Sequence, residues 1–273
     1  KSGAAIAQGL RDGGYDVVEI DIESRDFHIS EGIEAVFIAL HGQFGEDGEI
    51  QQQLTELGVP FTGSGAESSR VSFDKVLTRE RLEAHGIPVP KGEVLKNSKD
   101  RTVSVPLVVK PPREGSSVGC HLVFEELEFD AAFADAARYS EDVLVEDYIP
   151  GRELTVGVVD GQVLSVVEIK PNTQWYDFEA KYVTGDTQYI CPAELDENLK
   201  AELQTIALKT FHCLEAEGVG RVDFRLSPDN EPYVLELNAI PGFTATSLLP
   251  KAAKATGIGF SDLCCRIMEL AHL

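Results

Sequence analysis

The sequence has few basic residues for its size. Its 273 residues include 46 aspartates and glutamates but only 24 lysines and arginines, which gives a formal net charge of −22. Proteins that bind DNA or RNA generally present a basic surface, so we exclude nucleic acid as a general partner. The charge also has the wrong sign for binding an anionic membrane surface. An anionic substrate therefore requires a local basic pocket, and we expect metal ions to contribute to it.

Cysteine patterns typical of disulfide frameworks or zinc sites are absent as well. The five cysteines are scattered, and none belongs to a CxxC pair or a Cys/His cluster. We interpret them as reduced thiols, which favours a cytoplasmic protein. No apolar run approaches the roughly 20 residues of a membrane span, and no signal peptide is recognisable. Because the chain begins with Lys1 rather than Met, we expect a short N-terminal piece to be missing.

The first third of the chain predicts alternating strands and helices. Apolar runs at 15–22 and 35–40 and a short run at 59–63 predict strands, and 50–58 predicts a helix that Gly58 ends. This order is typical of βαβ units with a parallel sheet. Residues 67–86 predict one further helix.

Strand patterns dominate after residue 105. An Asp160-Gly161 pair between two apolar runs predicts a hairpin, and helices are expected near 129–139 and over 197–217. The aromatic stretch 170–190 has no periodicity and predicts a functional lid. We therefore expect an α+β protein with an α/β N-terminal unit. We divide it into an N-terminal domain, a central part, and a C-terminal part that contains the lid, with ranges 1–63, 64–147 and 148–273.

The strongest chemical signal lies in the stretch GRVDFRLSPDNEPYVLELNA. SPDNEP predicts a turn, and folding the flanks antiparallel about its midpoint places Asp223 opposite Glu236 and Arg221 opposite Asn238. Carboxylates about 5 Å apart repel each other unless one is protonated or a cation lies between them. Mg²⁺ or Mn²⁺ would satisfy both, with Asn238 as a third oxygen ligand. The alternative is that both carboxylates pair with Arg221 and Arg225 on a solvated face.

Polar residues also follow several other predicted strands. Lys110 ends one strand before a Gly/Ser loop, whose backbone N–H groups can form an anion nest. Glu146 and Glu153 flank the end of another strand, where carboxylates can bind ribose hydroxyls. His41 and Glu46 follow a buried strand, and ligands favour such carboxyl ends. Plainer interpretations stay open: a mobile hairpin loop, solvation of strand ends and a structural histidine.

Taken in order, these motifs resemble those of the ATP-grasp ligases, and among them the D-alanine–D-alanine ligase family. The resemblance spans nearly the whole chain through LHGQFGEDG, VKPPREGSSVG, YIPGRELTV, GRVDFRL and LELNAIPGFTATSLLP. It implies an ATP-grasp fold with an N-terminal parallel-sheet α/β (preATP-grasp) domain. It also implies ATP-dependent ligation of two D-alanines through an acyl phosphate, for peptidoglycan synthesis. ATP, two Mg²⁺ or Mn²⁺ ions and a cytoplasmic homodimer are the corresponding expectations.

The resemblance further implies roles for individual residues. ATP is expected to contact the set Lys75, Lys110, Glu146, Asp147, Tyr148, Ile149, Glu153, Trp175 and Lys181. The metal ions are expected on Asp223, Glu236 and Asn238. The substrates are expected beside His41, Glu46, Tyr182, Arg221, Gly242, Ser247 and Leu248. In this set Arg221 and the Gly242 amide stabilise the tetrahedral intermediate, and the helix that begins at Ser247 receives the second D-alanine's carboxylate. Ser116 and Tyr182 are expected to link the phosphate loop to the lid.

The chain departs from the family pattern in a few places. The family's first strand, with the glutamate that binds the first D-alanine's amine, is not in this chain, so that ligand cannot be named. Phe73 and Phe243 stand where the family more often has methionine. Tyr182 is the residue type associated with D-alanine in the second site, whereas D-lactate ligases have phenylalanine there. A D-Ala–D-Ser or D-Ala–D-lactate ligase, and a catalytically silent nucleotide-binding module, are the alternatives.

Overall fold

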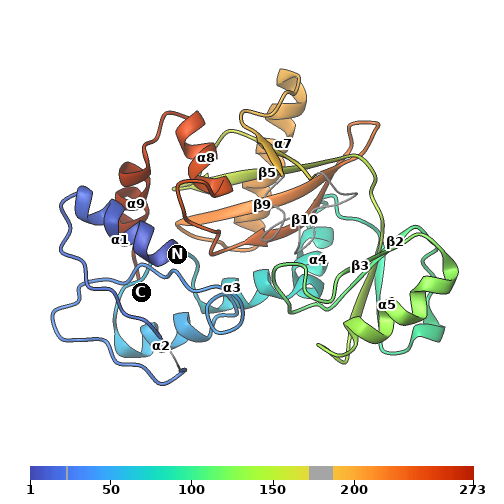
Figure 1. Ribbon diagram of the computed structural model, residues 1–273, viewed down its shortest axis with the longest axis horizontal. Helices are drawn as coiled ribbons and strands as arrows, with labels where there is room; N and C mark the ends of the chain where they lie inside the picture. Colours follow the sequence, from blue (N-terminus) through green and yellow to red (C-terminus); the bar gives the residue numbers. More distant parts are fainter. Residues whose placement is uncertain (23, 172–186) are drawn as a thin grey trace.

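Two antiparallel sheets form the framework of the protein (Figure 1). The computed structural model describes residues 1–22, 24–171 and 187–273. The four-stranded sheet has the order β1-β4-β2-β3, with β1 (Gly92–Leu95), β2 (Leu107–Lys110), β3 (His121–Val123) and β4 (Val143–Asp147). The six-stranded sheet has the order β10-β9-β5-β7-β8, with β6 paired to β5. Its strands are β5 (Arg152–Val159), β6 (Gln162–Val163), β7 (Val167–Lys170), β8 (Gln188–Ile190), β9 (Val219–Leu226) and β10 (Pro232–Asn238).

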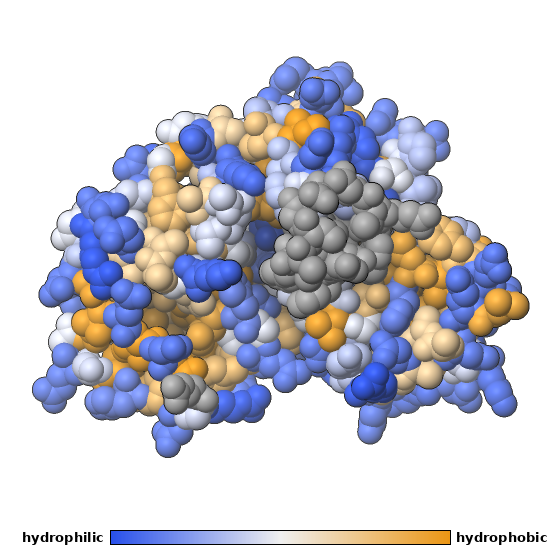
Figure 2. Space-filling model, in the orientation of Figure 1, coloured by the Kyte–Doolittle hydropathy of each residue, from blue (hydrophilic) through white to orange (hydrophobic). Residues whose placement is uncertain are grey.

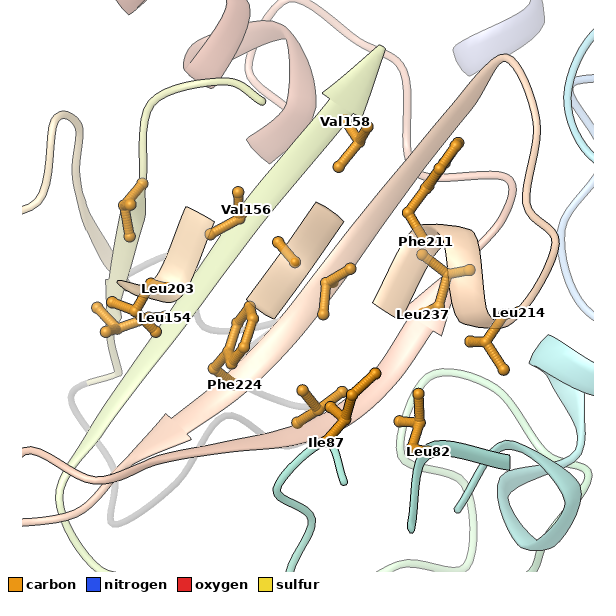
Figure 3. Close-up of a cluster of buried hydrophobic side chains, with 14 of the residues drawn as sticks. Leu82, Ile87, Leu154, Val156, Val158, Leu203, Phe211, Leu214, Phe224 and Leu237 are labelled. Carbon is orange, nitrogen blue, oxygen red and sulfur yellow. The ribbon is translucent and has the colours of Figure 1, made fainter. Parts of the chain in front are cut away.

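The six-stranded sheet buries one face and leaves functional side chains on the other. Leu154, Phe224 and Leu237 pack against Leu203 and Phe211 of α7 (Glu197–Cys213), as Figure 3 shows. Because successive strand residues point to opposite faces, the charged residues that alternate with these apolar ones face away from α7. The apolar half of the pattern therefore anchors the sheet, and the polar half is available for a site.

The helix predicted over 67–86 is two helices, so that prediction is wrong at its centre. α3 (Ala66–Phe73) ends at Asp74, whose φ of −86° and ψ of 107° are extended. The Asp74 carboxylate accepts hydrogen bonds from the backbone N–H groups of Val76 and Leu77, which makes it the N-cap of α4 (Lys75–Ala84). Both helices contribute side chains to the core under the six-stranded sheet. The break starts α4 at Lys75, the lysine predicted to contact phosphate.

The N-terminal parallel sheet is reduced, in the described part of residues 1–63, to one isolated parallel bridge between Val36 and Phe61. The ladder stops there because the Thr62 hydroxyl, not a backbone carbonyl, accepts the Ile38 N–H at 3.2 Å. No strand forms over residues 15–22: Val17 and Ile22 pack against the edges of two hydrophobic clusters, but Val18 is 59% exposed. The expectation of a sheet in this region is corrected accordingly.

Helices hold the N-terminal region in place instead. α1 (Ser2–Asp12) packs beside α9 (Phe260–Glu269), which brings the two ends of the chain together in Figure 1. α2 (Glu49–Leu57) confirms the helix expected at 50–58, and Gly58 ends it with a φ of 68°. Figure 2 shows hydrophobic surface over this region at lower left and over the four-stranded sheet's lobe at right, within a mostly hydrophilic exterior.

The remaining elements follow the sequence pattern closely. Asp160 and Gly161 have φ of 52° and 68° and join β5 to β6, as the hairpin signal predicts. The expected helices form as α5 (Phe129–Ala136) and α7. The other helical elements are α8 (Leu248–Ala255) and the short η1 (Ser98–Asp100) and η2 (Glu126–Glu128). Among the described helices, none combines the length and the apolar composition needed to cross a bilayer.

Candidate active site

Two adjoining cavities contain every predicted site residue that the structure describes. The first lies between the two sheets and is lined by Lys110, Glu146, Asp147, Tyr148, Ile149, Glu153 and Asp223. The second lies toward the N-terminal region and is lined by His41, Glu46, Asn238, Gly242, Ser247 and Leu248. Lys75, Glu114, Ser116, Arg221 and Glu236 line both. Trp175, Lys181 and Tyr182, which were also predicted, lie outside the described residues.

The β9–β10 hairpin has the predicted register where the chemistry lies. Glu236 pairs with Asp223 and Asn238 with Arg221, and both carboxylates line the first cavity. Toward the turn the register shifts by one residue between Val234 and Glu236, which the sequence analysis did not predict. The extra residue of this β-bulge is Leu235, and it lines the first cavity together with Glu236. The sequence offered one signal for this bulge. Leu235 directly precedes Glu236, and in a regular strand two successive side chains would point to opposite faces.

The carboxylates of this hairpin lie beside fixed cations. Asp223 accepts hydrogen bonds from Arg221 Nε at 2.8 Å and Arg221 Nη2 at 2.7 Å, and from the Thr155 hydroxyl at 2.6 Å. Lys75 Nζ lies 3.5 Å from Glu236 Oε2. The Arg221–Asp223 pair is the contact that the alternative interpretation expected. It is not on a solvated face, however, because Asp223 is only 9% exposed.

The hairpin's oxygen ligands fit a divalent cation that also binds phosphate. Asp223 and Glu236 supply two carboxylates, and Asn238 supplies an amide oxygen that accepts the Ile240 N–H at 3.1 Å. Across the described ranges, no group of three His, Cys, Asp or Glu side chains is arranged to hold a metal ion. Mg²⁺ is commonly held by one or two carboxylates together with substrate phosphates, so this smaller set is sufficient for it.

A buried ion-pair network lies where the four-stranded sheet lines the first cavity. Lys110 Nζ lies 2.6 Å from Glu146 Oε2, and Arg79 Nη1 lies 3.3 Å from Glu146 Oε1. Burial disfavours the ammonium of Lys110, but the neighbouring Glu146, Cys120 and Glu236 together outweigh this effect and raise the pKa of Lys110. A Cβ at Gly92 would lie 2.8 Å from Glu146 Cγ, so glycine makes room for the network. Glu146 is therefore held between two cations at the edge of the cavity.

Gly242 and Ser247 approach each other in the second cavity. A Cβ at Gly242 would lie 3.4 Å from Ser247 Oγ, and Ser247 Oγ accepts the Thr244 N–H at 3.0 Å. Ser247 is also the N-cap of α8. His41 and Glu46 line the same cavity, and His41 Nδ1 lies 3.5 Å from Glu46 Oε1.

Comparison with known proteins adds an independent line of evidence. The family model described as D-ala D-ala ligase C-terminus matches residues 75–269, and the model described as D-ala D-ala ligase N-terminus matches residues 24–64. The chain belongs to the D-alanine–D-alanine ligase family. The family resemblance in the sequence is thereby confirmed.

Individual members of the ligase family align along the whole chain. The D-alanine–D-alanine ligase of Methylacidiphilum infernorum is 42% identical over 273 residues, which cover 100% of this chain and 90% of that protein. That of Syntrophotalea carbinolica is 44% identical, covering 100% of this chain and 91% of that protein. A crystal structure of the Bacillus anthracis D-alanine–D-alanine ligase complexed with ATP superposes with a TM-score of 0.83 at 29% identity, covering 98% and 90% of the two chains. The ATP-grasp fold is confirmed.

Some residues of this ligase-family site were not predicted from the sequence. Arg79 lies behind Glu146. Arg225 Nη1 lies 3.5 Å from Glu153 Oε2, and its Nε donates to the Ile149 carbonyl at 3.0 Å, so it braces the connection between β4 and β5. Lys251 and Tyr189 line the second cavity. A basic residue on the otherwise apolar strand β9 was the available signal for Arg225.

Proposed function

We propose that this protein joins two D-alanines to D-alanyl-D-alanine with ATP. The carboxylate of the first D-alanine attacks the γ-phosphorus, an O–P bond forms, and the bond to the β-phosphate oxygen breaks to release ADP. The amine of the second D-alanine then attacks the acyl phosphate carbonyl. Inorganic phosphate leaves and the amine loses a proton. The names of the relatives that align over the whole chain support this ligation. The proposed use of the product is as a precursor for peptidoglycan.

One observation carries this proposal: the two cavities meet at the same charged side chains. Lys75, Ser116, Arg221 and Glu236 line both cavities. A nucleotide in the first cavity would therefore present its terminal phosphate to a small molecule in the second. That adjacency is what phosphoryl transfer to a carboxylate requires, because the reacting atoms must be held about 3–3.5 Å apart.

The cations have distinct tasks in the proposed reaction. Lys75 and Lys110 bind phosphate oxygens, and Glu146, Glu153 and the backbone from Asp147 to Ile149 bind the adenosine. Arg221 is held in place by the two hydrogen bonds that it donates to Asp223, and it lies where the two cavities join. A fixed charge there stabilises the oxyanion of the tetrahedral intermediate without reorganisation, together with the Gly242 amide.

Asp223, Glu236 and Asn238 would hold two Mg²⁺ or Mn²⁺ ions. When bound, the ions supply positive charge to the phosphate oxygens.

The remaining assignments of the sequence analysis also stand as proposals. These are the three-part division at residues 63 and 147, a homodimer, and a cytoplasmic location, where ATP is available. Sedimentation velocity tests the homodimer, and a monomer mass at working concentration would contradict it.

Phosphate release with ATP, Mg²⁺ and D-alanine tests the activity in the full-length protein. Product masses from D-alanine, D-serine and D-lactate then identify the acceptor. Glu236→Gln should lower turnover by roughly 100-fold or more while the circular dichroism spectrum stays unchanged. Glu231→Gln is the matched control, because Glu231 is exposed on the same hairpin and should keep wild-type turnover.

Each negative result is informative. Wild-type rates in Glu236→Gln would refute its role as a metal ligand. If the unmodified protein showed no D-alanine-dependent phosphate release, the silent nucleotide-binding module would be favoured instead.

A further inference from the structure

Lys251 differs from the other site cations in its surroundings. It lies on α8, lines the second cavity and does not line the first. Its Nζ lies 4.1 Å from the centroid of the Tyr189 ring. In the part of the chain that the structure describes, no ion pair includes Lys251. Burial lowers the pKa of its amine, and the nearby Cys191 offsets part of this effect.

The cations of the first cavity all have protein carboxylates beside them. Lys110 lies 2.6 Å from Glu146, Lys75 lies 3.5 Å from Glu236, and Arg225 lies 3.5 Å from Glu153. The protein has nearly twice as many acidic as basic residues. A partly buried ammonium that faces only an aromatic ring is therefore unusual here. An aromatic face offsets only part of the cost of desolvating a charge, so the arrangement favours an anion that arrives with a ligand.

We propose that Lys251 binds the carboxylate of the second amino acid, the acceptor of the ligation. This inference rests on the proposed function and extends it by one residue. Lys251 lies one helical turn after Ser247, and its N–H donates to the Ser247 carbonyl at 3.1 Å. Residues four apart share a helix face, so Lys251 and the Ser247 end of α8 face the same part of the cavity.

Two anions could reach this part of the site, a phosphate of ATP or the carboxylate of the acceptor. The position of Lys251 distinguishes between them. ATP phosphates are expected near Lys110 and Asp223, which line the first cavity only. Lys251 lies on the other side of the junction, among Thr244, Ser247 and Tyr189. The anion that reaches it is therefore the acceptor's carboxylate, and Lys251 selects acceptors in which this group is free and charged.

The test compares D-alanine with D-alaninamide as acceptors, using the full-length protein with saturating ATP and D-alanine as donor. Products are separated by mass, and the ratio of kcat/KM for the two acceptors is measured. Lys251→Met should raise the KM for the second D-alanine about 10- to 100-fold. It should reduce the preference over D-alaninamide by the same factor and leave the KM for ATP unchanged. Lys251→Arg should keep most of the preference, because it keeps the charge.

Lys254→Met is the matched control, since Lys254 is an exposed lysine on the same helix. It should behave as wild type. Lys251→Gln is the second charge-removing variant if Lys251→Met does not fold, and the same loss of preference is expected. An unchanged preference in a folded variant that lacks the charge would overturn the inference and leave the proposed function standing. A wild-type protein without D-alanine-dependent turnover would overturn both.

Discussion

Replacing Glu146 by glutamine should destabilise the protein far more than its small change in shape suggests. Glu146 is 5% exposed, and Lys110 and Arg79 are each 8% exposed. The carboxylate lies 2.6 Å from Lys110 Nζ and 3.3 Å from Arg79 Nη1, so its removal leaves two buried cations beside a neutral amide. Breaking a buried ion pair by removing one partner costs about 3–5 kcal/mol. We expect a loss of that size in the free energy of unfolding.

Urea unfolding at pH 7 without nucleotide, followed by circular dichroism, measures the effect. Glu83→Gln is the control because Glu83 also contacts Arg79, at 2.6 Å, but its side chain is 50% exposed. An exposed pair contributes at most about 1 kcal/mol, so this variant should stay close to wild type. If Glu146→Gln lost less than about 1 kcal/mol, or if both variants lost the same amount, burial would not be what makes the Glu146 network strong.

Two further predictions concern pH and the break between α3 and α4. Burial disfavours the charged form of Lys110, but Glu146, together with Cys120 and Glu236, outweighs burial and raises the pKa of Lys110 above the ordinary 10.5. The charged form of Lys110 therefore contributes its full stabilisation below pH 10.5, the ordinary lysine pKa. This stabilisation is lost as the pH rises from there through the raised pKa of the folded protein. Urea unfolding at pH 9 and pH 11 should show the loss, and Lys110→Met should show a smaller dependence over the same interval. Asp74→Ala removes the N-cap of α4 and should cost about 1 kcal/mol of unfolding free energy, whereas Asp74→Asn can still cap and should cost less. Equal losses for the two Asp74 variants would exclude capping as the cause.

The register of the β9–β10 hairpin could be predicted because a turn and strand alternation determine it locally. Asp223 and Glu236 meet as expected since a turn near residue 229 leaves one antiparallel pairing that buries Val222 and Leu237 together. The bulge at Leu235 could not be predicted in this way. The bulge depends on tertiary packing, because the cavity lies on one side of β10 and the hydrophobic core on the other.

The helix break at Asp74 was missed for a related reason. The apolar residues between 67 and 86 fit one continuous helix. The Asp74 side chain, however, competes with the backbone carbonyls of the preceding turn for the N–H groups of the next turn. The N-terminal strands were overestimated because apolar runs predict burial, whereas Val18 is exposed. In the described part of residues 1–63, parallel pairing is limited to the bridge between Val36 and Phe61.

By itself, the sequence determined the hairpin at Asp160-Gly161, the helices α5 and α7, the pairing of Asp223 with Glu236 and the set of residue types that ATP chemistry requires. Turns and strand alternation act over a few residues, so they can be recognised along the chain. Only the tertiary structure decided which cation lies beside which carboxylate, since Arg79 and Glu146, or Lys251 and Tyr189, come from distant elements. It also decided that the two cavities meet at Glu236. Burial and charge pairing depend on distances in space, and packing sets those distances.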